Sequence, residues 1–263
     1  MAEMLERMGA AARAAARALA SATAGEKNKA LQCMAQSLLE RQEEILAANR
    51  QDMDAAAESG MAKAMLDRLS LSPSRIAGMA DGLRQVAALA DPVGEIVQGG
   101  LRPNGLRIEK TRVPLGVVGI IYEARPNVTS DAAALCLKAG NAVILRGGKE
   151  ALRSNAAVAD ALRDGLASAG LNPDAVQLIR DTSRETANAM MRLHGVIDVL
   201  IPRGGAHPRG GRKRDRPRDR NRGGQLPHLH RPGRGHRDGR PHHRQRQGIP
   251  PLGLQRGGNP AGA

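Results

Sequence analysis

The chain has 263 residues, and 40 Lys and Arg against 26 Asp and Glu give it a formal net charge of +14. Most of this charge lies in residues 207–263, where 15 basic and three acidic residues leave a net of +12. Residues 1–206 hold the remaining 25 basic and 23 acidic residues, a net of +2. The longer part therefore has the charge balance of an ordinary globular protein and not of a nucleic-acid-binding domain.

The two cysteines, Cys33 and Cys136, have no Cys-x-x-Cys partner and no histidine beside them. They predict neither a disulfide framework nor a zinc site, so we expect small buried thiols, no bound metal and a reducing compartment. Charged residues interrupt the first 24 residues, where a secretory leader would need an apolar core, and we expect a cytoplasmic protein. Tyr122 is the only aromatic residue, so the core must be aliphatic.

The first 91 residues carry apolar side chains at helical spacing. Leu31, Met34 and Leu38 are one example, and similar stripes recur from residue 3 to residue 91. Ser-Pro at 72–73 supplies a helix N-cap followed by a proline in the first turn. This part of the chain is predicted to form about four helices.

Residues 95–111 break the helical pattern. Two short β-rich segments, 95–97 and 106–111, are separated by Gly and Pro and predict a hairpin or an excursion from the main body. Strands and helices then alternate with short turns, which is typical of βαβ units around a parallel sheet. The expected strands are 117–122, 142–145, 176–179 and 196–201, and the expected helices are 129–138, 149–169 and 184–193.

The most informative segment is VPLGVVGIIYEARPN, residues 113–127, an apolar strand that ends in a polar turn just before a helix. Ligands of an open α/β sheet bind outside the carboxyl ends of its strands, so this turn is a candidate site. Arg125 within it is a candidate for binding an anionic substrate. Asn127 could cap the following helix or donate to a developing oxyanion, and position alone favours capping.

The strand at 142–145 leads into five candidate cofactor-binding residues: Arg146, Gly147, Gly148, Lys149 and Glu150. No acid follows the strand directly to bind a ribose 2′-hydroxyl, whereas Arg146 and Lys149 could meet a 2′-phosphate, which favours NADP(H). A second pair, Gly204 and Gly205, follows the last strand, where backbone amides could meet a phosphate. The GxGxxG pattern of a common dinucleotide site does not occur in residues 1–206. A Gly-Gly pair before a helix is more often an ordinary turn than a binding site, and the second pair alone is weak evidence.

Two segments carry a specific resemblance. Residues 113–151 read VPLGVVGIIYEARPNVTSDAAALCLKAGNAVILRGGKEA, and residues 197–206 read IDVLIPRGGA. Both closely resemble the gamma-glutamyl phosphate reductase family, a member of the aldehyde dehydrogenase superfamily, and the similarity extends over residues 1–206. The resemblance implies an aldehyde-dehydrogenase-like α/β fold, with N-terminal helices and a truncated Rossmann-like parallel sheet that binds NADP.

The resemblance also implies a reaction, the NADPH-dependent reduction of L-glutamyl 5-phosphate to L-glutamate 5-semialdehyde and phosphate in proline biosynthesis. In the family mechanism, a cysteine thiolate attacks the acyl phosphate and forms a thioester that accepts hydride. Asn127 matches the oxyanion-hole amide, which reverses the preference for capping. Residues 146–150 match the adenosine-binding turn, and Gly204 and Gly205 lie near the cofactor phosphates. A homo-oligomer and a partnership with glutamate 5-kinase are implied by the family, and no membrane is.

The chain departs from the family after residue 206. The family continues with a segment containing Glu-Thr-Gly and later with Ser-Val-Cys-Asn, which bears the nucleophile, and neither occurs here. Residues 207–263 consist mainly of Arg, Gly, Pro and His and cannot bury enough apolar surface to offset chain entropy, so we predict a disordered tail. Without the nucleophile, we expect no reductase activity.

The genetic code offers an origin for this tail. With synonymous codons chosen freely, residues 254–261 can be written CTG CAA CGC GGC GGA AAC CCT GCT. Reading begun one base later gives Cys-Asn-Ala-Ala-Glu-Thr-Leu, and the same shift at residues 219–225 gives Ile-Glu-Thr-Gly-Ala-Gly. We therefore predict an out-of-frame lesion near Ala206 and His207, with the codon of the catalytic cysteine split between Leu254 and Gln255.

A second interpretation treats the tail as functional. An Arg/Gly-rich segment of net charge +12 could bind nucleic acid non-specifically, carried by a non-catalytic Rossmann-like body. The tail has none of the aromatic residues on which single-stranded bases usually stack. Under either interpretation the chain has two parts, 1–206 and 207–263.

Overall fold

The computed structural model describes residues 2–193 and 195–203, all within the first of two units, residues 1–210 and 211–263. The predicted tail and Gly204 and Gly205 lie outside the described residues. Five helices come first: α1 (Ala2–Ala20), α2 (Ala24–Glu40), α3 (Gln42–Glu58), α4 (Lys63–Leu69) and α5 (Pro73–Ala88). There is one more helix than expected because Gly60, at φ +73°, separates the short α4 from α3.

The starts of α2 and α5 show why these helices begin where they do. Thr23 and Glu26 form a capping box, in which the Thr23 hydroxyl accepts from Glu26 N and the Glu26 carboxylate accepts from Thr23 N. At α5, the Ser72 hydroxyl accepts from Arg75 N, and Pro73 occupies the first turn. The N-cap that Ser-Pro predicted at this position is therefore confirmed.

A two-stranded hairpin follows, in which β1 (Ile96–Leu101) pairs antiparallel with β2 (Arg107–Thr111). All eleven residues of the two strands are exposed. The hairpin predicted from the sequence is confirmed, although β1 extends to Leu101, through two glycines that end the β-rich pattern in the sequence.

The alternating part of the chain builds one parallel sheet, as predicted. Its elements are β3 (Val117–Ile121), α6 (Asn127–Lys138), β4 (Ala142–Arg146), α7 (Leu152–Ser168), β5 (Val176–Leu178), α8 (Arg184–Met191) and β6 (Val199–Pro202). The strand order is β5-β4-β3-β6. Short 3₁₀ turns at Lys149–Ala151 and Pro173–Ala175 replace the helix start expected at residue 149 and part of the loop before β5.

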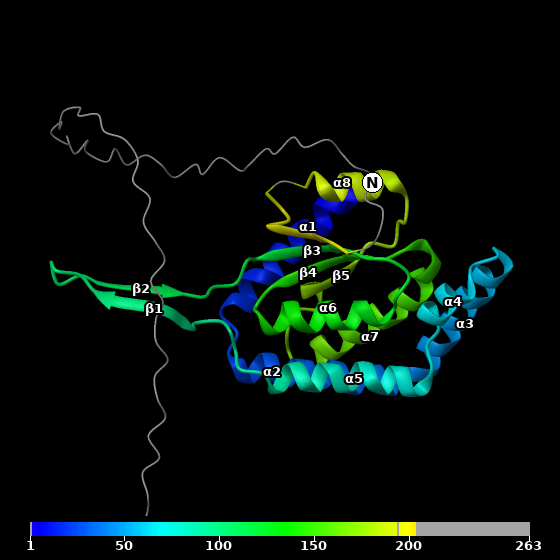
Figure 1. The fold of residues 1–263 in the computed structure, drawn as a ribbon, viewed down its shortest axis with the longest axis horizontal. Coiled ribbons are helices and arrows are strands. Elements are labelled where there is room, and N and C mark those ends of the chain that lie inside the picture. The colour runs from blue at the N-terminus through cyan, green and yellow to red at the C-terminus, as the bar shows by residue number, and fades with distance from the viewer. Residues whose placement is uncertain (1, 194, 204–263) are drawn as a thin grey trace, which may run out of the picture. The chain divides into compact units, whose positions relative to one another are not determined.

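Helices cover both faces of this sheet (Figure 1). On one face, α6 and α7 pack on side chains such as Val118 and Leu145, and α2 and α5 pack behind these two helices. On the other face, α1 and α8 enclose side chains that include Val117 and Ile144. The core is aliphatic, as composition required, and Tyr122 is its single aromatic member. Among the described helices, none has the length and apolarity needed to cross a membrane.

The strand order fixes where a ligand site can lie. After β3 the chain builds β4 and β5 on one side and then returns to place β6 on the other side of β3. β3 therefore has a strand added on each side, where the order of the sheet reverses, and a crevice at the carboxyl edge is the usual ligand position at such a switch point. At that edge lie Arg146, the last residue of β4, and Tyr122 and Arg203, which directly follow β3 and β6.

Candidate functional site

The β3–α6 turn lies at this switch point and carries Asn127. The turn is tight, because Arg125 N donates to Glu123 O at 2.8 Å and Val128 N donates to Arg125 O at 3.1 Å. Pro126 is the N-cap of α6, and no side chain caps this end of the helix. Asn127 is instead the first helical residue, so the capping role favoured by position alone is wrong.

The Asn127 side chain is exposed, and one hydrogen bond to the protein fixes its orientation. Its Nδ2 donates to Asp131 Oδ2 at 3.2 Å, one helical turn further along α6. Burial raises the pKa of the Asp131 carboxyl, while the bond from Asn127 and the charge of Arg203 partly offset this rise. Asp131 thus orients the Asn127 amide from a half-buried position beside the exposed edge of the turn.

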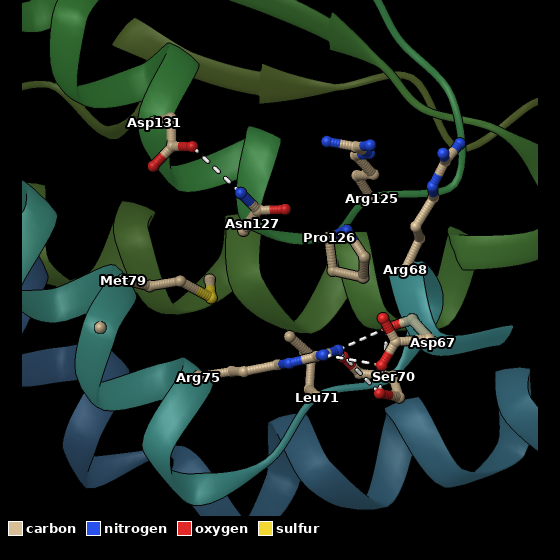
Figure 2. A pocket seen from close by; sticks show the side chains of 11 residues that line it. Asp67, Arg68, Ser70, Leu71, Arg75, Met79, Arg125, Pro126, Asn127 and Asp131 are labelled. Atoms are coloured by element: carbon tan, nitrogen blue, oxygen red, sulfur yellow. Dashed lines mark hydrogen bonds and ion pairs between the residues drawn. The ribbon is translucent and has the colours of Figure 1, made fainter. Parts of the chain in front are cut away.

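Asn127 lines a cavity of about 530 Å³ between the β3–α6 turn and the α4–α5 segment (Figure 2). Its lining residues are Asp67, Arg68, Ser70, Leu71, Arg75, Gly78, Met79, Arg125, Pro126, Asn127 and Asp131. A volume of this size is in the range of small-molecule sites. Arg125 and Asn127 are thus brought together as the sequence predicted, whereas the α4–α5 residues were not among the candidates.

The three cavity arginines differ in their partners. Arg75 donates to Asp67 Oδ1 at 2.9 Å, Ser70 O at 2.7 Å and Ser70 Oγ at 2.8 Å. Arg68 and Arg125 are exposed, and neither side chain has a hydrogen bond or ion pair with another described residue. Figure 2 shows both near Pro126 on the side opposite Arg75. The cavity therefore presents two guanidinium groups without protein acceptors.

At the end of β4, the Arg146 side chain contacts the loop that precedes α8. Its Nη2 donates to Thr182 O at 2.8 Å and Ser183 O at 3.1 Å, while its buried Nε has no partner among the described residues. Burial lowers the pKa of Arg146, and the charges of Asp181 and Glu150 partly oppose that change. In this conformation the Arg146 guanidinium supports the loop before α8.

Close packing leaves no room for a side chain at Gly147 or Gly148. A Cβ on Gly147 would lie 2.1 Å from Asn155 Nδ2, a buried atom with no hydrogen-bond partner in the described part of the chain. A Cβ on Gly148 would lie 3.3 Å from Ala124 N and 2.7 Å from Glu150 Oε2. The β4 turn therefore packs directly against the β3–α6 turn, and Lys149 is exposed beside it.

Neither cysteine lines the cavity. Cys136 is a buried residue of α6, and burial raises the pKa of its thiol to about 12, so it stays protonated at neutral pH. This confirms the prediction of an inert buried residue. Cys33 on α2 is only half-buried, so the prediction of a buried thiol is not met there, although its backbone carbonyl carbon would lie 2.9 Å from a Cβ on Gly165 of α7.

Comparison with known proteins identifies the family. The model of the aldehyde dehydrogenase family matches residues 1–201. A gamma-glutamyl phosphate reductase from Clostridium botulinum is 59% identical over 195 residues, which is 74% of this chain and 47% of that protein. A protein of the same name from Salmonella agona is 55% identical over 203 residues, 77% of this chain and 49% of that protein.

Solved structures agree with the sequence comparison. The crystal structure of a gamma-glutamyl phosphate reductase from Thermotoga maritima superposes with a TM-score of 0.75 at 43% identity, covering 76% of this chain and 49% of that one. The chain therefore spans about half the length of the relatives that it matches. Because the family model covers most of its residues, the chain belongs to the aldehyde dehydrogenase family.

Proposed function

We propose that the gene behind this chain encodes an NADPH-dependent reductase of L-glutamyl 5-phosphate, which forms L-glutamate 5-semialdehyde and phosphate. The observation that carries the proposal is the exposed Asn127 amide, placed at the switch point of a parallel sheet and beside the unpaired Arg125. The name shared by the relatives at 55–59% identity supports this choice of substrate within a family of NAD(P)-dependent oxidoreductases.

In this proposal Asn127 and Arg125 act on the two ends of the acyl phosphate bond. The Asn127 amide donates a hydrogen bond to the carbonyl oxygen as negative charge develops there, and Asp131 keeps the amide in position. Arg125 binds the phosphate and stabilises it as it leaves. A thiolate nucleophile must approach the same carbonyl, and neither Cys33 nor Cys136 does so.

The turn after β4 fits the adenosine end of the cofactor. Lys149 is an exposed cation at the carboxyl edge, suited to the 2′-phosphate of NADP, and Glu150 follows it. Arg146, whose guanidinium already bonds two carbonyls, shapes the turn and leaves Lys149 as the main contact. When bound, NADPH supplies hydride. Gly204 and Gly205 remain candidates for the phosphates by resemblance.

We further propose that this 263-residue chain is inactive and that residues 207–263 are an out-of-frame reading of the enzyme's own gene. The family match ends at residue 201, close to the expected lesion near Ala206 and His207. The matched part of this chain covers only 47% and 49% of two of its relatives, and a restored frame would supply the Cys-Asn segment. Self-association and a partnership with glutamate 5-kinase stay predictions from the resemblance.

Sequencing the DNA and restoring the frame tests both statements. The restored enzyme should interconvert aldehyde, phosphate and NADP⁺ with acyl phosphate and NADPH, and Asn127→Ala should lower its kcat by about 10²–10³-fold. The 263-residue chain should give no turnover. An absence of any open frame through Cys-Asn, or turnover by the chain as it stands, would contradict the proposal.

A further inference from the structure

The β3–α6 turn and the β4 turn lie against each other at the carboxyl edge of the sheet. Tyr122 N, just after β3, donates to the carbonyl of Arg146, the last residue of β4, at 3.0 Å. A Cβ on Gly148 would lie 3.3 Å from Ala124 N, so backbone packs against backbone there. Any change in the packing of these turns would therefore alter the distance between Asn127 and the residues that we assign to the cofactor.

One buried side chain, Asn155 of α7, contacts both turns. Its Oδ1 accepts from the hydroxyl of Thr129, in the first turn of α6, at 3.1 Å. Its Nδ2 fills the space beside Gly147, where an added Cβ would lie only 2.1 Å from it. Asn155 is 1% exposed, and its Nδ2 has no hydrogen-bond partner among the described residues. The contact with Gly147 is therefore one of packing, and the contact with Thr129 is a hydrogen bond.

The backbone that carries Asn155 is bound to α3. The carboxylate of Asp52 accepts from both N and Oγ of Ser154, the preceding residue, at 2.7 Å each. Asn49 donates through Nδ2 to the same hydroxyl at 3.0 Å. Asp52, Ser154 and Asn49 are all buried. These bonds fix the start of α7, so Asn155 meets the two turns from a rigid support.

We propose that Asn155 is a positioning residue, which sets the separation between the Asn127 amide and the β4 turn. This inference rests on the proposed function and adds to it the residue that aligns the two parts of the site. Asn155 is too buried to touch a ligand, and a smaller side chain in its place would let the two turns shift. A misplacement of about 1 Å can lower the rate of a reaction by about 10²-fold.

A double-mutant cycle on the 263-residue chain tests the contact without reference to activity. Gly147→Ala should destabilise because its methyl group meets the Asn155 amide, and Asn155→Ala should destabilise because Thr129 loses its acceptor. In the double variant the methyl group takes the vacated space, so the urea midpoint should fall by less than the sum of the two single shifts. Additive shifts would overturn the inference.

The frame-restored enzyme tests what the contact does. Asn155→Ala should lower kcat by about 10²-fold, leave KM for glutamate semialdehyde and for NADP⁺ close to wild type, and raise the primary deuterium isotope effect of hydride transfer. Leu162→Ala is the matched control, because Leu162 is a buried core residue further along α7. It should reduce stability and leave the isotope effect unchanged.

The two kinds of failure are distinguishable. An active enzyme in which Asn155→Ala and Leu162→Ala behave alike would refute the positioning role and leave the proposed function intact. A restored wild-type enzyme without turnover would contradict the proposed function, and the inference that rests on it would fall as well.

Discussion

Thr129 is the centre of a buried hydrogen-bond chain that joins the three elements of the carboxyl edge. Its Oγ1 lies 2.7 Å from the Tyr122 hydroxyl at the end of β3, and it donates to Asn155 Oδ1 of α7 at 3.1 Å. All three side chains are at most 3% exposed. Burial raises the pKa of Tyr122, so its hydroxyl stays neutral and available as a donor.

Thr129→Val should therefore destabilise the fold without changing the volume of the side chain. It leaves both Tyr122 and Asn155 with an unsatisfied buried group, at a cost of about 1–3 kcal/mol each. Tyr122→Phe removes one hydroxyl and leaves the Thr129–Asn155 bond, so it should cost about 1 kcal/mol. Urea unfolding of the three proteins measures the difference, and equal losses would contradict this arrangement.

The two thiols should differ in reactivity. A pKa of about 12 leaves Cys136 roughly 10⁻⁴ ionised at pH 8, and burial also blocks a reagent, whereas Cys33 is half-buried. A thiol-disulfide reagent such as DTNB should therefore titrate one group in the folded chain and two in denaturant. Cys33→Ser is the control, which should leave no fast-reacting thiol. Rapid reaction of both groups in the native state would show that α6 opens readily.

Single residues also mark the limit of sequence-based prediction. Asn127 and Arg125 could be named because a strand, a polar turn and a helix follow one another within a few residues. The place of Arg68 in the cavity had no such signal, because tertiary packing of α5 against α6 brings the end of α4 to the β3–α6 turn. Asn127 failed as a cap because Pro126 already takes the N-cap position.

At the scale of elements, α2 and α7 approach so closely that their contact requires a glycine. A Cβ on Gly165 of α7 would lie 2.5 Å from Met34 Cα and 2.6 Å from Met34 N, both backbone atoms of α2. Backbone atoms of a helix cannot move aside as the end of a flexible side chain can. A side chain at position 165 would therefore fit only if α2 and α7 moved apart.

Gly165→Ala should thus lower the free energy of unfolding by about 1–3 kcal/mol. Gly78→Ala on α5 is the matched control, because an added Cβ there has nothing within 4 Å, and the higher helix propensity of Ala should stabilise the chain by about 0.5–1 kcal/mol. Thermal unfolding compares the two. Equal and positive shifts of Tm would refute the close α2–α7 contact.

A buried ion pair connects α2 to the segment that follows α5. Lys27 Nζ lies 2.6 Å from Asp91 Oδ2, and the Lys27 side chain is 1% exposed. Burial favours the neutral acid, but the hydrogen bonds from Lys27 and from Val93 N outweigh it and lower the pKa of Asp91. The ionised form is therefore the one that folding stabilises.

Because the pKa of Asp91 is lowered in the folded state, the protein should lose stability in acid. The contribution of Asp91 is complete above its ordinary pKa of 3.8 and disappears as the pH falls through its lower folded value. Asp91→Asn should destabilise by about 3 kcal/mol near pH 7, because Lys27 stays buried without its partner, and the difference should shrink below about pH 3. Urea unfolding across this range provides the measurement, and a difference that stays constant with pH would contradict it.

The sequence predicted the order of the helices and strands better than it predicted where each one begins and ends. The alternation after residue 113 predicted each strand and helix of the parallel sheet, because short turns and apolar runs force that order. The start of α7 was displaced because residues 149–151 form a 3₁₀ turn of the same local composition. The strand order itself depends on right-handed crossovers and on which faces are apolar, which a single sequence states only indirectly.

At the scale of the whole molecule, the described core consists of residues from the first part of the chain. All members of the three hydrophobic clusters lie between Met4 and Leu200, on both faces of the sheet. The composition of residues 207–263, with 15 basic and three acidic residues, supplies charge and almost no apolar surface. Folding of the body and binding of polyanions should therefore be separable properties.

Deleting residues 207–263 tests this separation and the alternative function together. The shortened chain should unfold at the same Tm as the full chain, because the deletion removes no member of the described core. The full chain should bind single-stranded DNA weakly, with an affinity that falls steeply between about 50 mM and about 200 mM salt, and the shortened chain should not bind.

Scrambling the order of the tail residues is the control, because counterion release depends on charge and not on sequence. Loss of binding on scrambling would favour a nucleic-acid-binding function for the tail, whereas retention fits an out-of-frame segment that binds by charge alone.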